Sequence, residues 1–285
     1  ATLTAWCEKN GYSVEPDPNI RLSDELFALL SKEFYRNKEV KINSDRALVE
    51  TKAKTKDEPR DYDIFRTEAS EEELEHYWED DYGVRYSLDG KKVLKASKEL
   101  KGLDYSIKEG VLIICDRAFQ AKELHSITLP DSVVSIGGVA FANNDNMVSC
   151  NIPASVKYIA DNNPWGGCFC IKKMECKSPL FQIIDGILYA SDFRVCYGMI
   201  YWNSYNIEID FRTKIICANA FWSSRSIANN MIKSVRLIDV DEVGAQAFFN
   251  CKSAVFKIEH PIKLVRADSF AKCESLEGID LSKTI

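Results

Sequence analysis

The side chains in this chain of 285 residues best suited to metal or redox chemistry are its ten cysteines. Cys168, Cys170 and Cys176 lie close together, and three thiolates are potential zinc ligands. Zinc sites built from sequence-local ligands use paired C-x-x-C spacing or a nearby histidine, and this cluster has neither. The sequence therefore predicts neither a metal site nor a cofactor.

The chain contains three histidines, so few side chains are available for acid–base or nucleophilic catalysis. His125 and Cys150 would be the candidate nucleophilic pair, but the strand alternation described below places His125 on the surface and Cys150 inside. The acidic pair Asp80–Asp81 falls in an expected helix, and no glycine-rich phosphate loop is present. The sequence predicts a protein that is not an enzyme.

A repeated pattern organises the second half of the chain. Phe119 and Phe141 are 22 residues apart, as are Phe248 and Phe270, while Phe221 and Phe248 are 27 apart. The residue before each phenylalanine is small: Ala118, Ala140, Ala220, Ala247 and Ser269. The residue five positions before is β-branched: Ile114, Ile136, Ile216, Val243 and Val265. This periodicity predicts a solenoid whose phenylalanines stack inside, with Trp165 replacing phenylalanine in a further coil.

Four of the five phenylalanines, all but Phe248, are followed by an apolar triplet spaced three and then two residues. The triplets are Leu124, Ile127 and Leu129; Met147, Cys150 and Ile152; Ile232, Val235 and Leu237; and Leu276, Ile279 and Leu281. Pro130 and Pro153 end two of the expected strands because proline has no amide hydrogen to donate. Residues 180–209 depart from the pattern, and we interpret them as two strands in an irregular coil.

The repeat explains six of the cysteines. Cys168, Cys251 and Cys273 lie three residues after a column aromatic, Cys115 and Cys217 lie four before one, and Cys150 belongs to a triplet. Free cysteine commonly behaves as a small buried apolar residue. We therefore expect free thiols, which favour a reducing compartment.

These residues carry a family resemblance. The segment LHSITLPDSVVSIGGVAF follows the pattern L-x-x-I-x-L-P-x-x-V-x-x-I-x-x-x-A-F-x-x-C, and the chain over about residues 83–285 resembles bacterial leucine-rich repeat proteins of the BspA type. The resemblance implies an α+β repeat fold: a leucine-rich-repeat solenoid of short strands in a right-handed coil, preceded here by a small helical segment. It implies binding to varied partners and no shared catalytic site.

The N-terminus differs in character. Ser23 is a good helix N-cap, and Leu22 and Phe27 have the spacing of a hydrophobic staple. The segment LTAWCEKNGYSVEPDPNIRLSDELFALLSKEF resembles the small helical domain at the N-terminus of translation initiation factor two, over about residues 1–36. That resemblance implies a cytoplasmic location. Because the chain begins inside the expected helix, we expect it to be a fragment.

Four segments are predicted. They are a truncated helical domain (1–40), a charged linker (41–69), an acidic helix with a capping hairpin (70–102) and the repeats (103–285). Ser70 and Glu73 have capping-box spacing, with Leu74, Tyr77 and Trp78 on one helix face. Asp89–Gly90 is a strong hairpin signal, and this hairpin is expected to begin the sheet.

The expected binding site is the solvent-facing side of the strands that carry the triplets, because side chains alternate across a strand. The residues expected to bind a partner are Ser126, Thr128, Ser149, Asn151, Lys172, Lys173, Glu175, Lys233 and Arg236. They form an expected stripe that runs from neutral to basic and ends on acidic Glu277 and Asp280, a pattern that suits a protein of complementary charge. Net charge of −6 gives no general attraction for nucleic acid, and no apolar run approaches the roughly 18 residues of a membrane span.

Three hypotheses follow. The first is a cytoplasmic, non-enzymatic scaffold for protein–protein interaction that uses the curved solenoid face. The alternative is a surface or secreted adhesin for host or matrix proteins. A third is association with the ribosome or a nucleic acid through residues 1–36.

Overall fold

The computed structural model describes residues 63–168, 170–172, 174–201, 205–222 and 232–276. The helical domain predicted over residues 1–40, the start of the linker and the triplet residues Ile279 and Leu281 lie outside the described residues. The described part is a β-solenoid of seven coils in which α3 (Glu71–Glu75) is the one α-helix. This part confirms the predicted solenoid of short strands and contains almost no helix, whereas the helical segment expected before it falls on residues outside the description.

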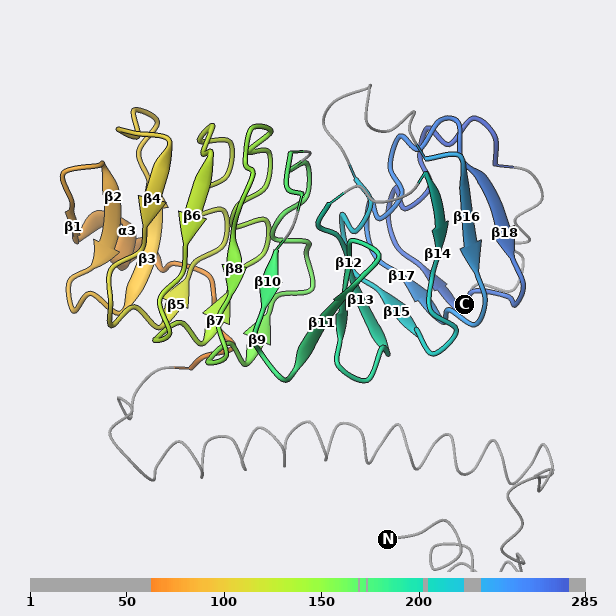
Figure 1. The fold of residues 1–285 in the computed structure, drawn as a ribbon, viewed down its shortest axis with the longest axis horizontal. Helices are drawn as coiled ribbons and strands as arrows, with labels where there is room; N and C mark the ends of the chain where they lie inside the picture. Colours follow the sequence, from red (N-terminus) through yellow and green to blue (C-terminus); the bar gives the residue numbers. More distant parts are fainter. Residues whose placement is uncertain (1–62, 169, 173, 202–204, 223–231, 277–285) are drawn as a thin grey trace, which may run out of the picture. The chain divides into compact units, whose positions relative to one another are not determined.

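Each coil contributes a short strand before its column aromatic, which we call the lead strand. Figure 1 shows these strands following one another along the solenoid. Neighbouring lead strands pair in parallel within two sheets, β5-β7-β9 and β13-β15-β17-β19. The lead strands are β5 (Ile113–Ile114), β7 (Ser135–Ile136), β9 (Tyr158–Ile159), β13 (Val195–Met199), β15 (Ile215–Ile216), β17 (Glu242–Val243) and β19 (Leu264–Val265).

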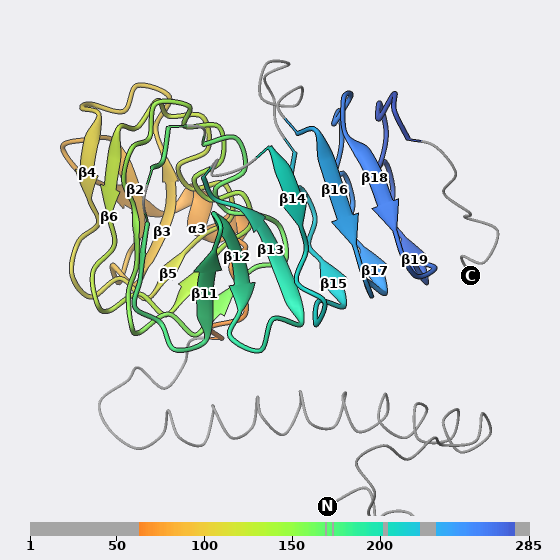
Figure 2. The same cartoon turned by 45° about the vertical axis from the view of Figure 1, so that its right-hand side comes forward.

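A second strand in each coil carries the apolar triplet, and we call it the triplet strand. Figure 2 shows β14, β16 and β18 side by side. The parallel pairs are β4-β6, β8-β10 and β14-β16-β18, with an isolated bridge from Ser126 to Ser149 joining the first two. The triplet strands are β4 (Asp104–Ser106), β6 (Ser126–Thr128), β8 (Asn151–Ile152), β10 (Glu175–Cys176), β14 (Asn206–Glu208), β16 (Ser234–Leu237) and β18 (Val255–Ile258).

The predicted aromatic column is confirmed. Phe119, Phe141 and Phe248 are fully buried. The rings of Phe119 and Phe141 stack at 5.9 Å between centroids, and those of Phe221 and Phe248 at 4.9 Å. Trp165 takes the next place in the first stack, 5.6 Å from Phe141. The small residues before the aromatics are buried as well, so adjacent coils come close enough for ring stacking.

Backbone hydrogen bonds link successive coils around each aromatic. The N–H of Phe119 donates to the carbonyl of Ala140 at 2.7 Å, and the N–H of Phe221 donates to Ala247 at the same distance. The backbone bends on both sides of the ring through residues with positive φ. The residues with positive φ that lie two positions before an aromatic are Arg117, Val139, Asn219, Gln246 and Asp268. Those that lie two positions after an aromatic are Ala121, Asn143, Asn250 and Lys272. A left-handed conformation at a non-glycine residue costs about 1–3 kcal/mol and persists where surrounding contacts fix it.

Residues 70–96 close the N-terminal end of the solenoid. The predicted capping box is present, since Ser70 Oγ accepts from the Glu73 N–H and the Glu73 carboxylate accepts from the Ser70 N–H. The helix ends after one turn, however, and Tyr77 and Trp78 belong to β1 (Tyr77–Glu79) rather than to a helix face. The predicted hairpin is confirmed as β2 (Val84–Ser87) and β3 (Lys92–Ala96), and β3 pairs in parallel with β5.

A strap formed by residues 63–67 crosses three coils on the side of the lead strands. The hydroxyl of Thr67 donates to Asp116 Oδ1 at 2.7 Å, and the Ser135 hydroxyl donates to the carbonyl of Ile64. The ring of Phe65 meets that of Tyr158 edge-on at 5.3 Å. These residues were assigned to the end of the charged linker, but they pack on the solenoid.

A hairpin interrupts the solenoid between its third and fourth lead strands. Residues 180–209 were predicted to hold two strands, but the structure has β11 (Phe181–Ile184) and β12 (Ile187–Ala190) before β13, and then β14. Asp185 and Gly186 both have positive φ, as in the turns that join short hairpins. Successive β12 side chains face two different cores, with Leu188 in the first and Ile187 and Tyr189 in the second.

The nine cysteines of the described residues are free. The three cysteines that follow a column aromatic each donate to a backbone carbonyl of an earlier coil: Cys168 Sγ to Phe141 at 3.2 Å, Cys251 Sγ to Phe221 at 3.9 Å, and Cys273 Sγ to Phe248 at 3.1 Å. Asn144 makes the same contact in another coil, with Nδ2 2.8 Å from the Phe119 carbonyl. The thiols therefore cover backbone carbonyls within the core.

Phe141→Ala is expected to lower the free energy of unfolding by about 3–5 kcal/mol, the usual effect of deleting a buried aromatic side chain. Urea denaturation followed by circular dichroism measures this. Leu88→Ala is the matched control, because the Leu88 side chain is 70% exposed and its truncation should change little. Equal urea midpoints for Phe141→Ala and Leu88→Ala would contradict the conclusion that the stacked ring of Phe141 stabilises the solenoid.

Native alkylation should separate the cysteines. Burial raises the pKa of Cys115, Cys150 and Cys168 to about 12, whereas Cys170 is exposed. A thiol of pKa near 12 is roughly one part in ten thousand thiolate at pH 8, and the thiolate is the reactive form. Among these four, iodoacetamide should label Cys170 first, as read by peptide mass spectrometry.

After denaturation without reductant, thiol titration should count close to ten. This total includes Cys7, which lies outside the described residues. A count several thiols lower would reveal disulfides and would favour the adhesin.

Candidate protein-binding face

The exposed side of the triplet strands presents two outward columns in the first half of the solenoid. Strand pairing aligns Asp104, Ser126 and Ser149 in one column. The other column contains Ser106, Thr128, Asn151 and Glu175. The structure therefore brings five of the predicted binding residues together on β6, β8, β10 and the Ser149 bridge.

Asn151 has a structural task on this face. Its Oδ1 accepts from the Leu129 N–H at 2.8 Å, and its Nδ2 donates to the Leu129 carbonyl at 2.9 Å. Both bonds join β8 to the end of β6, where Pro130 follows. Thr128 and Ser149 are exposed, so these two side chains are better placed to meet a partner.

Asp104, His125 and Ser126 form a cluster of residue types that recur in hydrolases. Both His125 Nδ1, at 3.1 Å, and Ser126 Oγ, at 2.5 Å, contact the same oxygen, Asp104 Oδ1. These hydrogen bonds, first that of Ser126 and then that of His125, lower the pKa of the Asp104 carboxyl. A nucleophilic triad needs the histidine between serine and carboxylate, so this arrangement does not activate Ser126.

The expected basic centre is largely neutralised. Arg236 on β16 bonds Glu208 on β14 at 2.7 Å and Glu259, just beyond β18, at 2.8 Å. Lys257 lies 3.3 Å from the same Glu259 carboxylate. The Glu259 contact and then the Glu208 charge raise the pKa of Arg236, so the guanidinium stays charged and paired. Lys233 lies over the Tyr205 ring, 5.5 Å from its centroid.

The expected stripe is not continuous. The sheet that contains β16 is separate from those of β6, β8 and β10, and Figure 1 shows β11 and β12 between β10 and β14. Lys172 is exposed, Glu175 pairs with Lys177 at 3.4 Å, and Lys173 lies outside the described residues. The prediction of one stripe failed because the hairpin breaks the register of the repeat.

The sequence interpretation missed an apolar component beside this break. Leu180, Ile184, Tyr205 and Phe211 are each exposed by 45% or more. Three of them lie within residues 180–209, the stretch that departs from the repeat, and Phe211 lies two residues beyond its end. That departure was the available signal, since large apolar side chains outside the repeat columns have no core position.

A sequence profile of the BspA type Leucine rich repeat region matches residues 96–195 and 195–285. The chain belongs to this family. A second match joins the N-terminal region to translation initiation factor IF-2 of Bacteroides fragilis, 37% identical over 54 residues. This match covers 19% of the chain and 5% of the factor, so the chain spans a small part of that relative's length.

Solved structures of leucine-rich repeat proteins are also similar to this BspA-type chain. A leucine rich cell surface protein from Faecalibacterium prausnitzii A2-165 is 25% identical, with a TM-score of 0.49 over 63% of this chain and 53% of that one. A leucine-rich repeat protein of T. pallidum is 17% identical, with a TM-score of 0.38 over 75% of this chain and 94% of that one.

No helix among the described residues is long and apolar enough to cross a membrane.

Asn151→Leu should lower the free energy of unfolding by about 1–3 kcal/mol, because it leaves the N–H and C=O of Leu129 without their partners. Ser149→Ala, at a neighbouring exposed position, should leave the denaturation midpoint unchanged and serves as control. If both variants are as stable as the parent, Asn151 does not tie β8 to β6.

Proposed function

We propose that this protein is a non-enzymatic interaction module that binds a partner protein through the exposed side of its triplet strands. The observation that carries the proposal is the register of the outward columns, in which Ser126, Thr128 and Ser149 repeat across adjacent coils. Short polar side chains on paired strands form a broad polar surface, which suits a folded partner more than a small molecule, because small-molecule sites are concave and mostly apolar.

Membership of the BspA-type family supports a role in protein binding, since the resemblance implies binding to varied partners. The candidate binding residues are those with exposed side chains, above all Thr128, Ser149, Lys172 and Lys233. Arg236 contributes a charge that Glu208 and Glu259 already balance, so we assign it to the ordering of β14, β16 and the end of β18.

The proposed location is a reducing compartment, as in the cytoplasmic scaffold. The free, mostly buried thiols support this location, because a secreted repeat protein would commonly cross-link cysteines that are so numerous. The similarity of the N-terminal region to an initiation factor points the same way.

The adhesin is the second candidate, and the family match favours it, because BspA-type leucine-rich repeat proteins are often surface or secreted proteins. The two candidates share the binding face and differ in redox environment. The thiol count described above therefore decides between them.

The binding face is tested by adding bulk to it. The partner is first recovered by pull-down with the full-length protein and mass spectrometry, and its affinity is then measured by calorimetry with purified components. Thr128→Arg with Ser149→Arg should weaken binding by roughly tenfold or more, the effect of a clash at an interface core.

Asp131→Arg is the matched control, because Asp131 is exposed on the turn that follows β6 and is not part of a triplet strand. It should bind like the parent. Unchanged affinity in the Thr128 and Ser149 double variant, with an unchanged melting temperature, would contradict the proposal.

A further inference from the structure

Phe211 departs from the repeat at a defined position. A turn follows each of three triplet strands, closed by backbone bonds from Val133 to Pro130, from Val156 to Pro153 and from Thr213 to Asp210. Its second residue is Asp131 or Ala154 in the first two coils and Phe211 in the third, where the side chain is 62% exposed. An aromatic ring at this position contributes little to the core and is presented to solvent.

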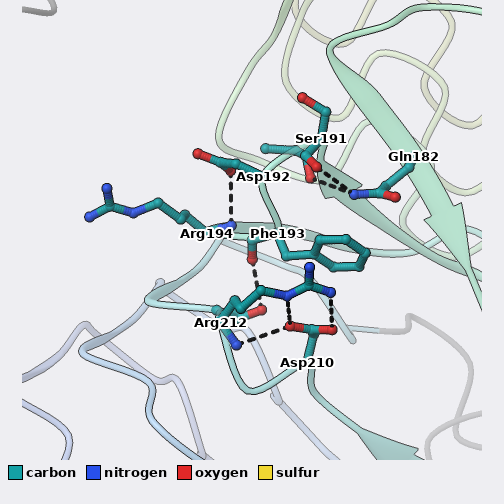
Figure 3. A network of polar contacts seen from close by, with 9 residues as sticks. Gln182, Ser191, Asp192, Phe193, Arg194, Asp210 and Arg212 are labelled. Atoms are coloured by element: carbon teal, nitrogen blue, oxygen red, sulfur yellow. Dashed lines mark hydrogen bonds and ion pairs between the residues drawn. The ribbon is translucent and has the colours of Figure 1, made fainter. Parts of the chain in front are cut away.

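The turn that carries Phe211 is held in one conformation. Arg212 Nε and Nη2 each donate to the Asp210 carboxylate at 2.8 Å, and the Arg212 N–H donates to Asp210 Oδ1 at 2.9 Å. The guanidinium also lies over the Phe193 ring, 3.5 Å from its centroid, and the Thr213 hydroxyl donates to the Phe193 carbonyl. Figure 3 shows this network connecting the turn after β14 to the turn between β12 and β13.

The charges around the turn balance in number, since Asp192 and Arg194, both exposed on the adjoining turn, are also opposite in sign. Arg212 is paired with Asp210, and Lys214 is paired with Asp239. Leu180, 45% exposed, adds apolar surface at the same end of the hairpin, because its carbonyl accepts from the Ser191 N–H at 2.8 Å, two residues before Phe193. An exposed ring with paired charges around it favours an apolar contact over a charged ligand.

We propose that Phe211 is the anchor residue of the protein–protein interface, and that the partner receives it in an apolar pocket with an uncharged rim. The proposal rests on the proposed function and places its main contact at the break in the solenoid instead of at the centre of the triplet strands. Aromatic anchors dominate interface energetics, and a turn that is already held in one conformation before association loses little freedom on binding.

The first experiment identifies what lies against the ring. The photoreactive residue p-benzoyl-phenylalanine is incorporated at position 211 of the full chain in its native host, with incorporation at position 131 as the matched control. Irradiation should give a cross-linked product specific to position 211. A product no stronger than that from position 131 overturns the proposal, as does cross-linking only to a second copy of this chain.

The second experiment measures how tightly the purified partner, identified by the cross-linking, binds to variants at Phe211. Phe211→Ser should weaken binding by roughly 30-fold, the size typical of an interface hot spot, with an unchanged melting temperature. Leu88→Ser, at a 70% exposed position on the β2–β3 turn, should bind like the parent. Affinity of Phe211→Ser within threefold of the parent overturns the anchor.

The Thr128→Arg and Ser149→Arg double variant separates the two proposals. If it abolishes binding while Phe211→Ser binds normally, the face is correct and the anchor is wrong. If only Phe211→Ser loses affinity, the anchor is supported and the contact is confined to the break. Normal binding by both variants overturns both proposals.

Discussion

The close approach of successive coils at the column aromatic is the constraint on which the solenoid depends. Ring stacking and the backbone hydrogen bonds beside the rings join the same pairs of coils. Each forms only when the two coils are close together, so each supports the other. Gly137 shows how tight the approach is, because a Cβ there would lie 2.5 Å from the backbone nitrogen of Asp116 in the preceding coil. Gly244 meets Ala218 in the same way. The left-handed residues on each side of the ring are tolerated because these bonds fix them.

The hairpin at β11 and β12 changes the solenoid from one core into two. In the regular coils each lead strand packs on the next, but β12 is buried on both faces and separates the clusters. Its presence keeps the triplet strands of the two halves in separate sheets. The surface at this break differs in kind from the repeated surface, since it exposes Tyr205 and Phe211, whereas the outward columns of the first half carry Ser126, Thr128 and Ser149.

The sequence predicted the buried columns because burial recurs at fixed spacing and needs no knowledge of register. Phe141, Ile136 and Ile152 are examples, and all are fully buried. The backbone bends were not predictable, since Arg117, Val139 and Gln246 carry no turn signal and owe their conformation to the neighbouring coil. The pairing of Arg236 was not predictable either, because Glu208 and Glu259 are 28 and 23 residues away and meet it only once β14, β16 and β18 are aligned. Among the candidate binding residues, the alternation of side chains along a strand correctly identified Thr128 and Ser149 as outward-facing. It could not show that the Asn151 side chain is hydrogen-bonded to the backbone of Leu129.

The strap over the lead strands has a mechanical consequence. Repeat arrays tend to come apart from an end, one coil at a time, because each repeat contacts only its neighbours. Residues 63–67 are fastened to three coils, through Asp116, Ser135 and Tyr158. A force applied to the chain at residue 63 would therefore load these three coils together in shear, and the array would resist peeling at the end where the strap enters.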